Sequence, residues 1–312
     1  MNLRFLRTFV AIADNAGFAR AATRLNLTQS AASRQIHALE DELGVRLFAR
    51  IGRGARLTAE GEDLLVRSRR LLSDAEALAE RASALKLGDI GVLRVGATPQ
   101  AIESLLAEFL RRYRKRHPGV EVPLVEDGGA RLPARLESGD LQIAIMPAGE
   151  NRFNARLLCP MYVFAVLPRG HRLASRAVLE VAELADEPLL RLGPSFASHG
   201  WLEAACQIAH ISPRVLLESA APQTLIALAR AGQGIAVIPS MVQISRVGVR
   251  VAVVVHRGVP IGRWAVAAWD PHRFFARYAL QFVEELVAYC ELGYPGREFL
   301  RRAPQLPKPD LD

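Results

Sequence analysis

Apolar residues at the start of the chain recur at helical intervals. Within the first thirteen residues they are spaced three and four positions apart, which predicts an amphipathic helix of about three turns. These positions are Leu3, Leu6, Val10 and Ala13. The pattern continues with a short helix over residues 18–25 and a third helix from Thr28, whose side chain can cap it, to about Leu43. The sequence therefore predicts a small helical domain at its start.

The turn between the second and third helices indicates a DNA-binding motif. Asn26 tolerates the left-handed backbone that such a turn requires. Two short helices around a tight turn, the second opening with small polar side chains and an arginine, are typical of a helix-turn-helix that enters the major groove. We predict this motif over Phe18 to His37, and its candidate base and phosphate contacts are Thr28, Gln29, Ser30, Ser33 and Arg34. For each residue alone an ordinary solvent-facing helix is the better explanation, so the prediction rests on the set.

Residues 46–58 predict a two-stranded wing with a glycine-rich tip. Arg50, Arg53 and Arg56 are placed on or near that tip, where phosphate contact and minor-groove insertion both favour arginine. The first 61 residues hold nine arginines and five acidic residues, and the chain of 312 residues has a formal net charge of +8. The positive charge is thus densest where double-stranded DNA would be met.

A heptad pattern follows over residues 64–85. The small and apolar positions keep a strict four-three spacing, which predicts a coiled-coil seam between two copies of this helix. The candidate dimerisation residues are Leu64, Leu71, Ala75, Leu78, Ala82 and Leu85. The alternative is a helix packed on its own domain. Gly88 and Gly91 end the helix and mark a domain boundary.

From residue 92 onward the pattern changes to short apolar strands alternating with helices. This alternation predicts an α/β domain over 88–292 with mainly parallel sheets. Two runs indicate two lobes, lobe I over about 90–165 and 265–292 and lobe II over about 166–264. Two such lobes form a cleft that can take a small ligand. The remaining residues, 293–312, carry several prolines and are predicted to be a flexible tail.

Strand-to-helix loops supply the candidate effector site. A free hydroxyl beside a helix N-terminus favours an anion, so we expect a small carboxylate or a similar anion there. Plain helix capping is an equally good explanation for each residue taken alone. The candidate residues are Thr98, Pro99, Gln100, Gly129, Ser195, Phe196 and Ser198.

Composition excludes several classes of protein. Half of the residues are hydrophobic, which indicates a packed globular chain. We find no signal peptide and no uninterrupted apolar run long enough for a membrane span, so the expected location is the cytoplasm. Cys159, Cys206 and Cys290 are too scattered for a disulfide framework or a metal site, and no cofactor or metal is predicted.

The N-terminal motifs resemble those of the LysR-type transcriptional regulators. The resemblance is dense over residues 1–61 and departs from the usual family pattern at Ala16-Gly17, at Ser30 and at Ala59-Glu60. Its matching stretches are Phe9-Val10-Ala11-Ile12-Ala13, Arg20-Ala21-Ala22, Thr28-Gln29-Ser30, Ser33-Arg34-Gln35-Ile36, Leu47-Phe48-Ala49-Arg50 and Leu57-Thr58. A looser resemblance to the family's periplasmic-binding-protein-like effector domain covers about 88–292, with markers at 136–145, 171–174 and 231–239.

This resemblance implies a winged helix-turn-helix over 1–61, a linker helix for dimerisation over 62–87 and a two-lobed effector domain. It implies a homodimer or homotetramer that binds double-stranded DNA, answers to a small-molecule effector and acts with RNA polymerase.

Other functions fit the residues less well. The alternative is a solute-binding module without a regulatory role, which would need export. An enzyme is not predicted, because the segment Gly193-Pro194-Ser195-Phe196-Ala197 only approximates a nucleophile elbow. A peroxide-sensing thiol switch is not expected either, because Cys206 has no near partner in the sequence.

Overall fold

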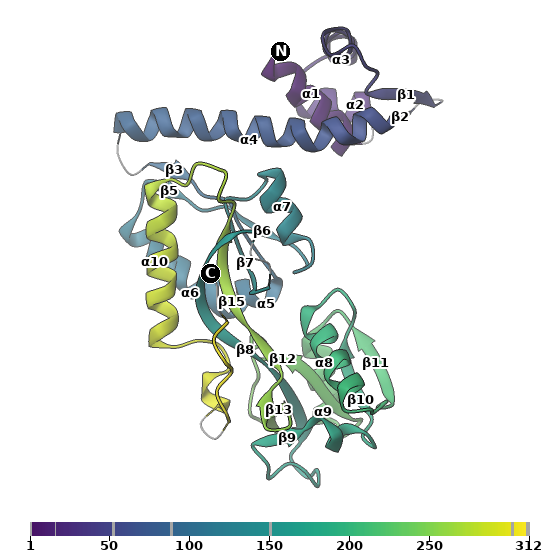
Figure 1. Cartoon of the computed structure of the whole chain (residues 1–312), viewed down its shortest axis with the longest axis vertical. Helices are drawn as coiled ribbons and strands as arrows, with labels where there is room; N and C mark the ends of the chain where they lie inside the picture. The colour runs from purple at the N-terminus through teal and green to yellow at the C-terminus, as the bar shows by residue number, and fades with distance from the viewer. Residues whose placement is uncertain are drawn as a thin grey trace. The chain divides into compact units, whose positions relative to one another are not determined.

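The computed structural model describes residues 2–15, 17–51, 54–87, 90–149, 152–300 and 303–309. It divides into two compact units, Met1–Gly88 with Glu137–Asp140 and Asp89–Leu136 with Leu141–Asp312. Figure 1 shows the elements of each unit with their labels. No helix of the described residues has the length and apolar character needed to cross a bilayer.

The first unit is a helical domain with a small antiparallel sheet. Its core is formed by fully buried side chains of three helices together with Leu47, and Leu72 of the long helix is added to it. The elements are α1 (Leu3–Asp14), α2 (Phe18–Arg24), α3 (Gln29–Leu43), β1 (Phe48–Ile51), β2 (Gly54–Leu57) and α4 (Ala59–Leu87). The predicted helices and the predicted wing are confirmed.

Local signals set the boundaries of α3. Thr28 is the N-cap, and its Oγ1 accepts a hydrogen bond from the Ala31 N–H at 3.2 Å. Asn26 adopts a left-handed backbone with φ of 54°, as the turn requires. Gly44 ends the helix with φ of 71°. These three residues therefore fix the position of the third helix along the chain.

The buried face of α1 differs from the predicted stripe. Phe9 and Ile12 are fully buried, whereas Leu3 is 36% exposed. The Phe9 ring meets Phe48 of the wing edge-to-face at 5.5 Å between centroids. The face of α1 that carries Phe9 is therefore buried against the wing. Helical spacing alone does not reveal this long-range contact.

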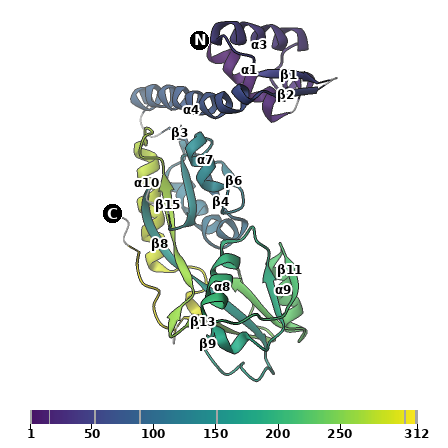
Figure 2. The same ribbon diagram turned by 45° about the vertical axis from the view of Figure 1, so that its right-hand side comes forward.

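The second unit contains one continuous sheet with helices packed on it. Lobe I has β4 (Val95–Ala97), β6 (Leu124–Glu126) and β7 (Ile143–Pro147) in the order β7-β4-β6, all parallel. Lobe II has β10 (Leu189–Leu192), β11 (Val215–Ser219) and β12 (Ile235–Pro239), with β10 parallel to both neighbours. The predicted two-lobed α/β fold is confirmed, and Figure 2 shows it from a second side.

Two long antiparallel strands join the lobes. The strand β8 (Asn154–Pro168) pairs with β15 (Gly262–Trp269) in its first part and with β12 and β13 (Val249–His256) in its last part. Met161 packs in the lobe I core and Tyr162 in the lobe II core, so the lobes meet inside β8, earlier than the expected boundary at 165. The long strand β13 was not predicted.

Helices cover both lobes. The first helical segment of lobe I is divided into α5 (Pro99–Ala101), a π-helical turn η1 (Ile102–Leu106) and α6 (Ala107–Arg116). Lobe I also carries α7 (Leu132–Ser138) and α10 (Arg277–Leu292), and lobe II carries α8 (Ala197–Ile208) and α9 (Pro222–Arg230). The remaining short elements are β3 (Gly91–Val92), β5 (Val120–Glu121), β9 (Val178–Glu180), η2 (Val181–Leu184), β14 (Val259–Pro260) and η3 (Arg297–Phe299).

The expectation of a flexible tail is wrong for its described residues. Leu306 is 8% exposed and belongs to the lobe II core. Its N–H donates to the Tyr162 hydroxyl at 3.2 Å, and the Trp264 indole N–H donates to the Pro307 carbonyl at 2.9 Å. The Phe299 ring packs edge-to-face on Phe164. Apolar side chains between the prolines therefore anchor this segment, which proline content alone does not indicate.

Candidate functional site

The polar residues predicted to contact DNA lie on one side of α3. Ala32, Ile36 and Leu39 are buried on the opposite side. The candidates Thr28, Gln29, Ser30 and Arg34 are exposed, and Ser33 is half-buried. The first two turns of the helix therefore present hydroxyl, amide and guanidinium groups to solvent. Their contact with DNA stays a prediction.

A buried carboxylate ties α3 to the wing. Glu40 is 5% exposed, and its Oε1 accepts hydrogen bonds from the N–H groups of Leu47 at 2.8 Å and Phe48 at 3.3 Å. Its Oε2 accepts from Arg46 at 2.7 Å. Burial raises the pKa of the Glu40 carboxyl, but these hydrogen bonds outweigh it, and the net pKa is lowered. The sequence analysis missed Glu40, because only the fold brings the wing to its side chain.

The wing arginines are placed unevenly by the structure. In the antiparallel pair β1–β2, Arg56 lies opposite Ala49, and Arg50 lies opposite Ala55. The Arg56 side chain is exposed. The side chain of Arg50 and the whole of Arg53 lie outside the described part of the structure. Arg56 is therefore the wing arginine that can be assigned to a solvent-facing position.

The predicted seam of α4 is partly buried at its start and exposed farther along the helix. Leu64 packs partly on the core of its own unit, and the non-seam residue Leu72 is buried there. Farther along the helix, Leu71 is 36% and Leu78 70% exposed. Ala75 is half-buried, Ala82 is exposed, and the side chain of Leu85 lies outside the described residues. The first turns of α4 thus pack within the unit and the later turns carry exposed apolar side chains, and the seam between two copies stays a prediction.

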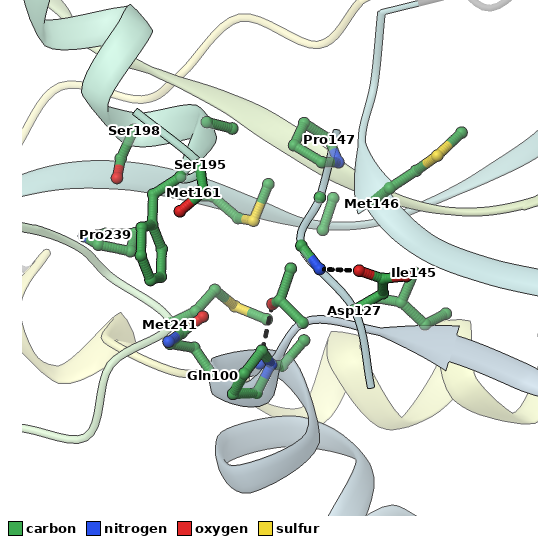
Figure 3. Close-up of a pocket in the computed structure, with 18 of the residues that line it drawn as sticks. Gln100, Asp127, Ile145, Met146, Pro147, Met161, Ser195, Ser198, Pro239 and Met241 are labelled. Atoms are coloured by element: carbon green, nitrogen blue, oxygen red, sulfur yellow. Dashed lines mark hydrogen bonds between the residues drawn. The ribbon is translucent and has the colours of Figure 1, made fainter. Parts of the chain in front are cut away.

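A cavity of about 690 Å³ lies in the second unit, between the two lobes. All the candidate effector residues line it, and they lie at the starts of α5 and α8, just before these helices, or in the loop before α7. They are Thr98, Pro99, Gln100, Gly129, Ser195, Phe196 and Ser198. Figure 3 shows Gln100 on one side of the cavity and Ser195 and Ser198 on the other. The structure therefore brings the predicted residues together, and their role in binding an effector stays a prediction.

The polar side chains of the cavity differ in whether they form hydrogen bonds within the protein. The Thr98 hydroxyl caps α5 by accepting from the Ala101 N–H at 3.4 Å. Gln100 is 6% and Ser198 7% exposed. Within the described residues, neither of these two side chains forms a hydrogen bond with protein. Both side chains line the cavity, so Gln100 and Ser198 are the groups best placed to bind a ligand.

The charges of the cavity are paired with one another. Arg131 Nε lies 3.2 Å from Asp127 Oδ1, and Arg135 Nη1 lies 3.1 Å from Asp127 Oδ2. Glu126 adds a second carboxylate to the lining. These two acids and two arginines balance, so the cavity carries no excess positive charge.

Sequence reasoning missed the apolar floor of the cavity. Met161, Met241, Ile145 and Ala265 line it and are each at most 8% exposed. They come from β7, β8 and β15 and from the segment after β12. Met161 and Met241 lie between Ser195 and Gln100 in Figure 3. These residues read as ordinary core in the sequence, and only the sheet order brings them to one surface.

Two cysteines also come together. Cys159 on β8 and Cys290 on α10 are each 1% exposed, and their side chains are hydrogen-bonded. That hydrogen bond and burial raise the pKa of the Cys159 thiol well above its usual range. Burial likewise raises the pKa of Cys206. Thiolates are the reactive form, so these thiols are held in the unreactive one. No group of three or more His, Cys, Asp or Glu residues suited to a metal occurs in the described residues.

Comparison with known proteins gives two family matches. Residues 3–62 match the family described as "Bacterial regulatory helix-turn-helix protein, lysR family". Residues 87–291 match the "LysR substrate binding domain". Among curated proteins, the regulator IlvR of Caulobacter vibrioides is 35% identical over 263 residues, covering 80% of this chain and 86% of IlvR. The regulator XapR of Escherichia coli K12 is 32% identical over 243 residues, covering 76% and 82%.

Solved structures give the same result for the fold. A full-length OxyR variant from Pseudomonas aeruginosa has a TM-score of 0.72 at 24% identity and covers 95% of this chain and 100% of its own. Full-length CbnR in complex with its target DNA has a TM-score of 0.64 at 25% identity, with 93% and 100% covered. Both similarities extend over the helix-turn-helix and the two lobes.

Proposed function

Because the chain belongs to the LysR family of DNA-binding transcriptional regulators, we propose that it binds its operator through α3 and the wing and answers to an effector in the interlobe cavity. The observation that carries the DNA interface is the exposed polar face at the start of α3. Gln29 and Arg34 have the side chains that pair bidentately with adenine and guanine, and Ser33 can serve either base. Arg50, Arg53 and Arg56 of the wing are assigned to the phosphates and the minor groove.

The cavity is the proposed effector site. Its size suits a small organic molecule, and its lining combines apolar walls with a few polar groups. The N-termini of α5 and α8 border it and favour negative charge, which supports the expected anion. Effector binding is proposed to change the angle between the lobes and thereby the arrangement of the oligomer on DNA.

Self-association is part of the proposal. The exposed Leu71 and Leu78 on α4 form an apolar edge that a second copy of the helix can cover. A dimer reads two half-sites about one helical turn apart, or a multiple of it. Full-length CbnR, which was solved in complex with its target DNA, is similar in structure to this chain and supports the proposed binding to DNA. A homotetramer, contact with RNA polymerase and a cytoplasmic location complete the proposal.

No reaction is assigned to the protein, because its curated relatives are named as transcriptional regulators. Ser195 has no histidine partner in the described residues, and a serine nucleophile needs one. The nearby His199 instead bonds the Leu192 carbonyl at 2.9 Å and lies 3.3 Å from Glu203. The alternative function is a solute-binding module without a regulatory role. It does not explain why the chain carries a helix-turn-helix domain.

Footprinting of the full-length protein on the DNA upstream of its own gene tests the proposal. We expect two protected half-sites whose centres are about one helical turn, or a multiple of it, apart. Binding to scrambled DNA of the same length should be at least about a thousandfold weaker, the lower end of the range for specific regulators. Equal binding to both DNAs would contradict the assignment of a sequence-specific interface.

A further inference from the structure

We infer that the cavity is built for an aromatic molecule that carries at most one negative charge, with Gln100 and Ser198 binding its polar group. This inference rests on the proposal that the interlobe cavity is the effector site. It narrows the expected anion, since it excludes multiply charged anions such as di- and tricarboxylates or phosphate.

The first step concerns charge. Arg131 and Arg135 are the only cationic side chains that line the cavity in the described part of the chain, and both are paired with Asp127. The Asp127 side chain is 12% exposed, so its charge is poorly hydrated and depends on these arginines. An anion with two or three charges would have to share the arginines with Asp127 and would also face Glu126. The cavity therefore resists multiple negative charge.

The second step concerns the body of the ligand. The floor carries two methionine side chains, Met161 at 8% and Met241 at 3% exposure, beside Ile145. Phe196 and Trp201 line the lobe II side and are half-buried. Thioether sulfur and aromatic rings both form favourable contacts with a further ring. This lining thus favours a flat apolar ring over a polar or fully extended chain.

The third step concerns the polar group. The Gln100 amide offers both a donor and an acceptor, and it is 6% exposed and without a protein partner among the described residues. Ser198 offers a hydroxyl from the opposite lobe and is 7% exposed. It lies in the first turn of α8, a helix of twelve residues, whose free N–H groups tolerate one negative charge. A single carboxylate, hydroxyl or carboxamide satisfies these groups without a cation.

Thermal-shift measurements on the full-length protein test the inference with matched probes. Benzoate, phenylacetate, benzyl alcohol and benzamide represent aromatic molecules with one charge or none. Succinate, citrate and inorganic phosphate represent multiply charged anions. We expect at least one aromatic probe to raise the melting temperature by about 2–4 °C at saturation, and the multiply charged anions to leave it unchanged. The opposite order, or no shift with any aromatic probe, would overturn the inference.

Variants of Gln100 identify the site of binding. Gln100→Ala should weaken the bound probe about tenfold, as expected for the loss of a hydrogen-bonding group in a buried site. Gln100→Glu should reject a carboxylate probe while it retains benzyl alcohol. Gln207→Ala, on an exposed position of α8 outside this cavity, is the matched control and should change neither. Unchanged affinity in both Gln100 variants would place the aromatic molecule elsewhere and refute the assignment.

Footprinting in the presence of a bound probe separates this inference from the proposed function. A probe that binds through Gln100 but leaves the DNA footprint unchanged supports the ligand class and contradicts the effector role of the cavity. A footprint altered by citrate and not by an aromatic probe supports the regulator and contradicts the ligand class.

Discussion

Arginines are treated differently in the two units of this protein. Arg34 on α3 and Arg56 on the wing are exposed, and no ion pair involves them in the described residues. Arg131 and Arg135 beside the cavity are both held by Asp127. Arg34 and Arg56 thus present free positive charge to solvent, whereas the charges of Arg131 and Arg135 are paired with a carboxylate.

The difference follows from the kind of partner. A phosphate backbone is a dense line of negative charge, and exposed arginines gain affinity by releasing its counterions. A small ligand in a partly closed cavity offers little charge, and an unpaired arginine there would pay for desolvation. The same side chain therefore serves long-range attraction in one unit and local structure in the other.

The largest expected effect tests the free arginine of α3. Arg34→Ala should weaken operator binding about ten- to a hundredfold, because a bidentate base contact contributes about 1–3 kcal/mol. Arg67→Ala removes an exposed arginine that α4 pairs with Asp63 at 3.1 Å, and it is the matched control. Fluorescence anisotropy with labelled operator DNA measures both. Equal losses in the two variants would mean that only overall charge matters.

A second change should give the cavity an excess of positive charge, as on the exposed surface of α3 and the wing. Asp127→Asn removes the carboxylate charge that pairs with Arg131 and Arg135, so citrate should bind about tenfold more tightly than to the unaltered protein, the gain expected from charge-assisted hydrogen bonds. Isothermal titration measures the change. Citrate affinity that stays the same in this variant would show that the arginines were not held back by Asp127.

A third change tests the buried carboxylate of the first unit, Glu40, which pairs with Arg46 as Asp127 pairs with Arg131 and Arg135. Glu40→Gln should lower stability by about 1–3 kcal/mol, because the hydrogen bonds to Leu47, Phe48 and Arg46 weaken. The pKa of Glu40 is lowered in the folded state, so its contribution is present above pH 4.5, the ordinary value, and is lost as the pH falls through the folded pKa. Denaturation at pH 7 and at pH 3 should show the difference between the proteins shrinking at the lower pH.

Two controls accompany the Glu40→Gln variant, one for stability and one for DNA binding. Glu62→Gln, an exposed acid on α4, should leave stability unchanged. Glu40→Gln should not strengthen binding to DNA, since Glu40 pairs with Arg46 and not with Arg34. A gain in DNA affinity would mean that both units restrain their arginines in the same way.

The smallest effect is expected at an exposed ion pair. Arg111 and Arg112 donate to Glu108 on α6 and lower its pKa to about 2. The three side chains are largely open to solvent, which screens the pairing. Glu108→Gln should therefore leave the melting temperature unchanged at pH 7, and any small contribution of this pair should disappear only as the pH falls from 4.5 towards 2. A clear loss of stability at pH 7 would show that exposed arginine pairing matters more than the comparison allows.

Local signals explain why the first unit could be predicted closely. Thr28, Asn26 and Gly44 act on their own neighbours, so their residue types alone locate the ends of α3 and its turn. The start of α5 follows the same logic, because the Thr98 side chain caps it, whereas α8 begins after Phe196 without a side-chain cap. Element order and helix starts are thus readable from sequence when they depend on residues a few positions apart.

Long-range contacts explain what could not be predicted. Glu40 meets backbone groups seven and eight residues away through the fold of the wing. Met161 and Met241 are eighty residues apart and meet only because β8 and β12 pair. Cys159 and Cys290 are farther apart still, and α10 has to pack on β8 to join them. Periodicity carries no information about such partners.

The anchored tail has a practical consequence. The family match ends at residue 291, and a shortened protein ending there would lack Phe299 and Leu306. The rings of Phe164 and Trp264, which these residues cover, would then face water at the junction of the lobes. Exposed aromatic surface of this kind promotes aggregation. Studies of the isolated effector domain should therefore retain the chain through Pro309, and the fluorescence of Trp264 should report whether the tail is seated.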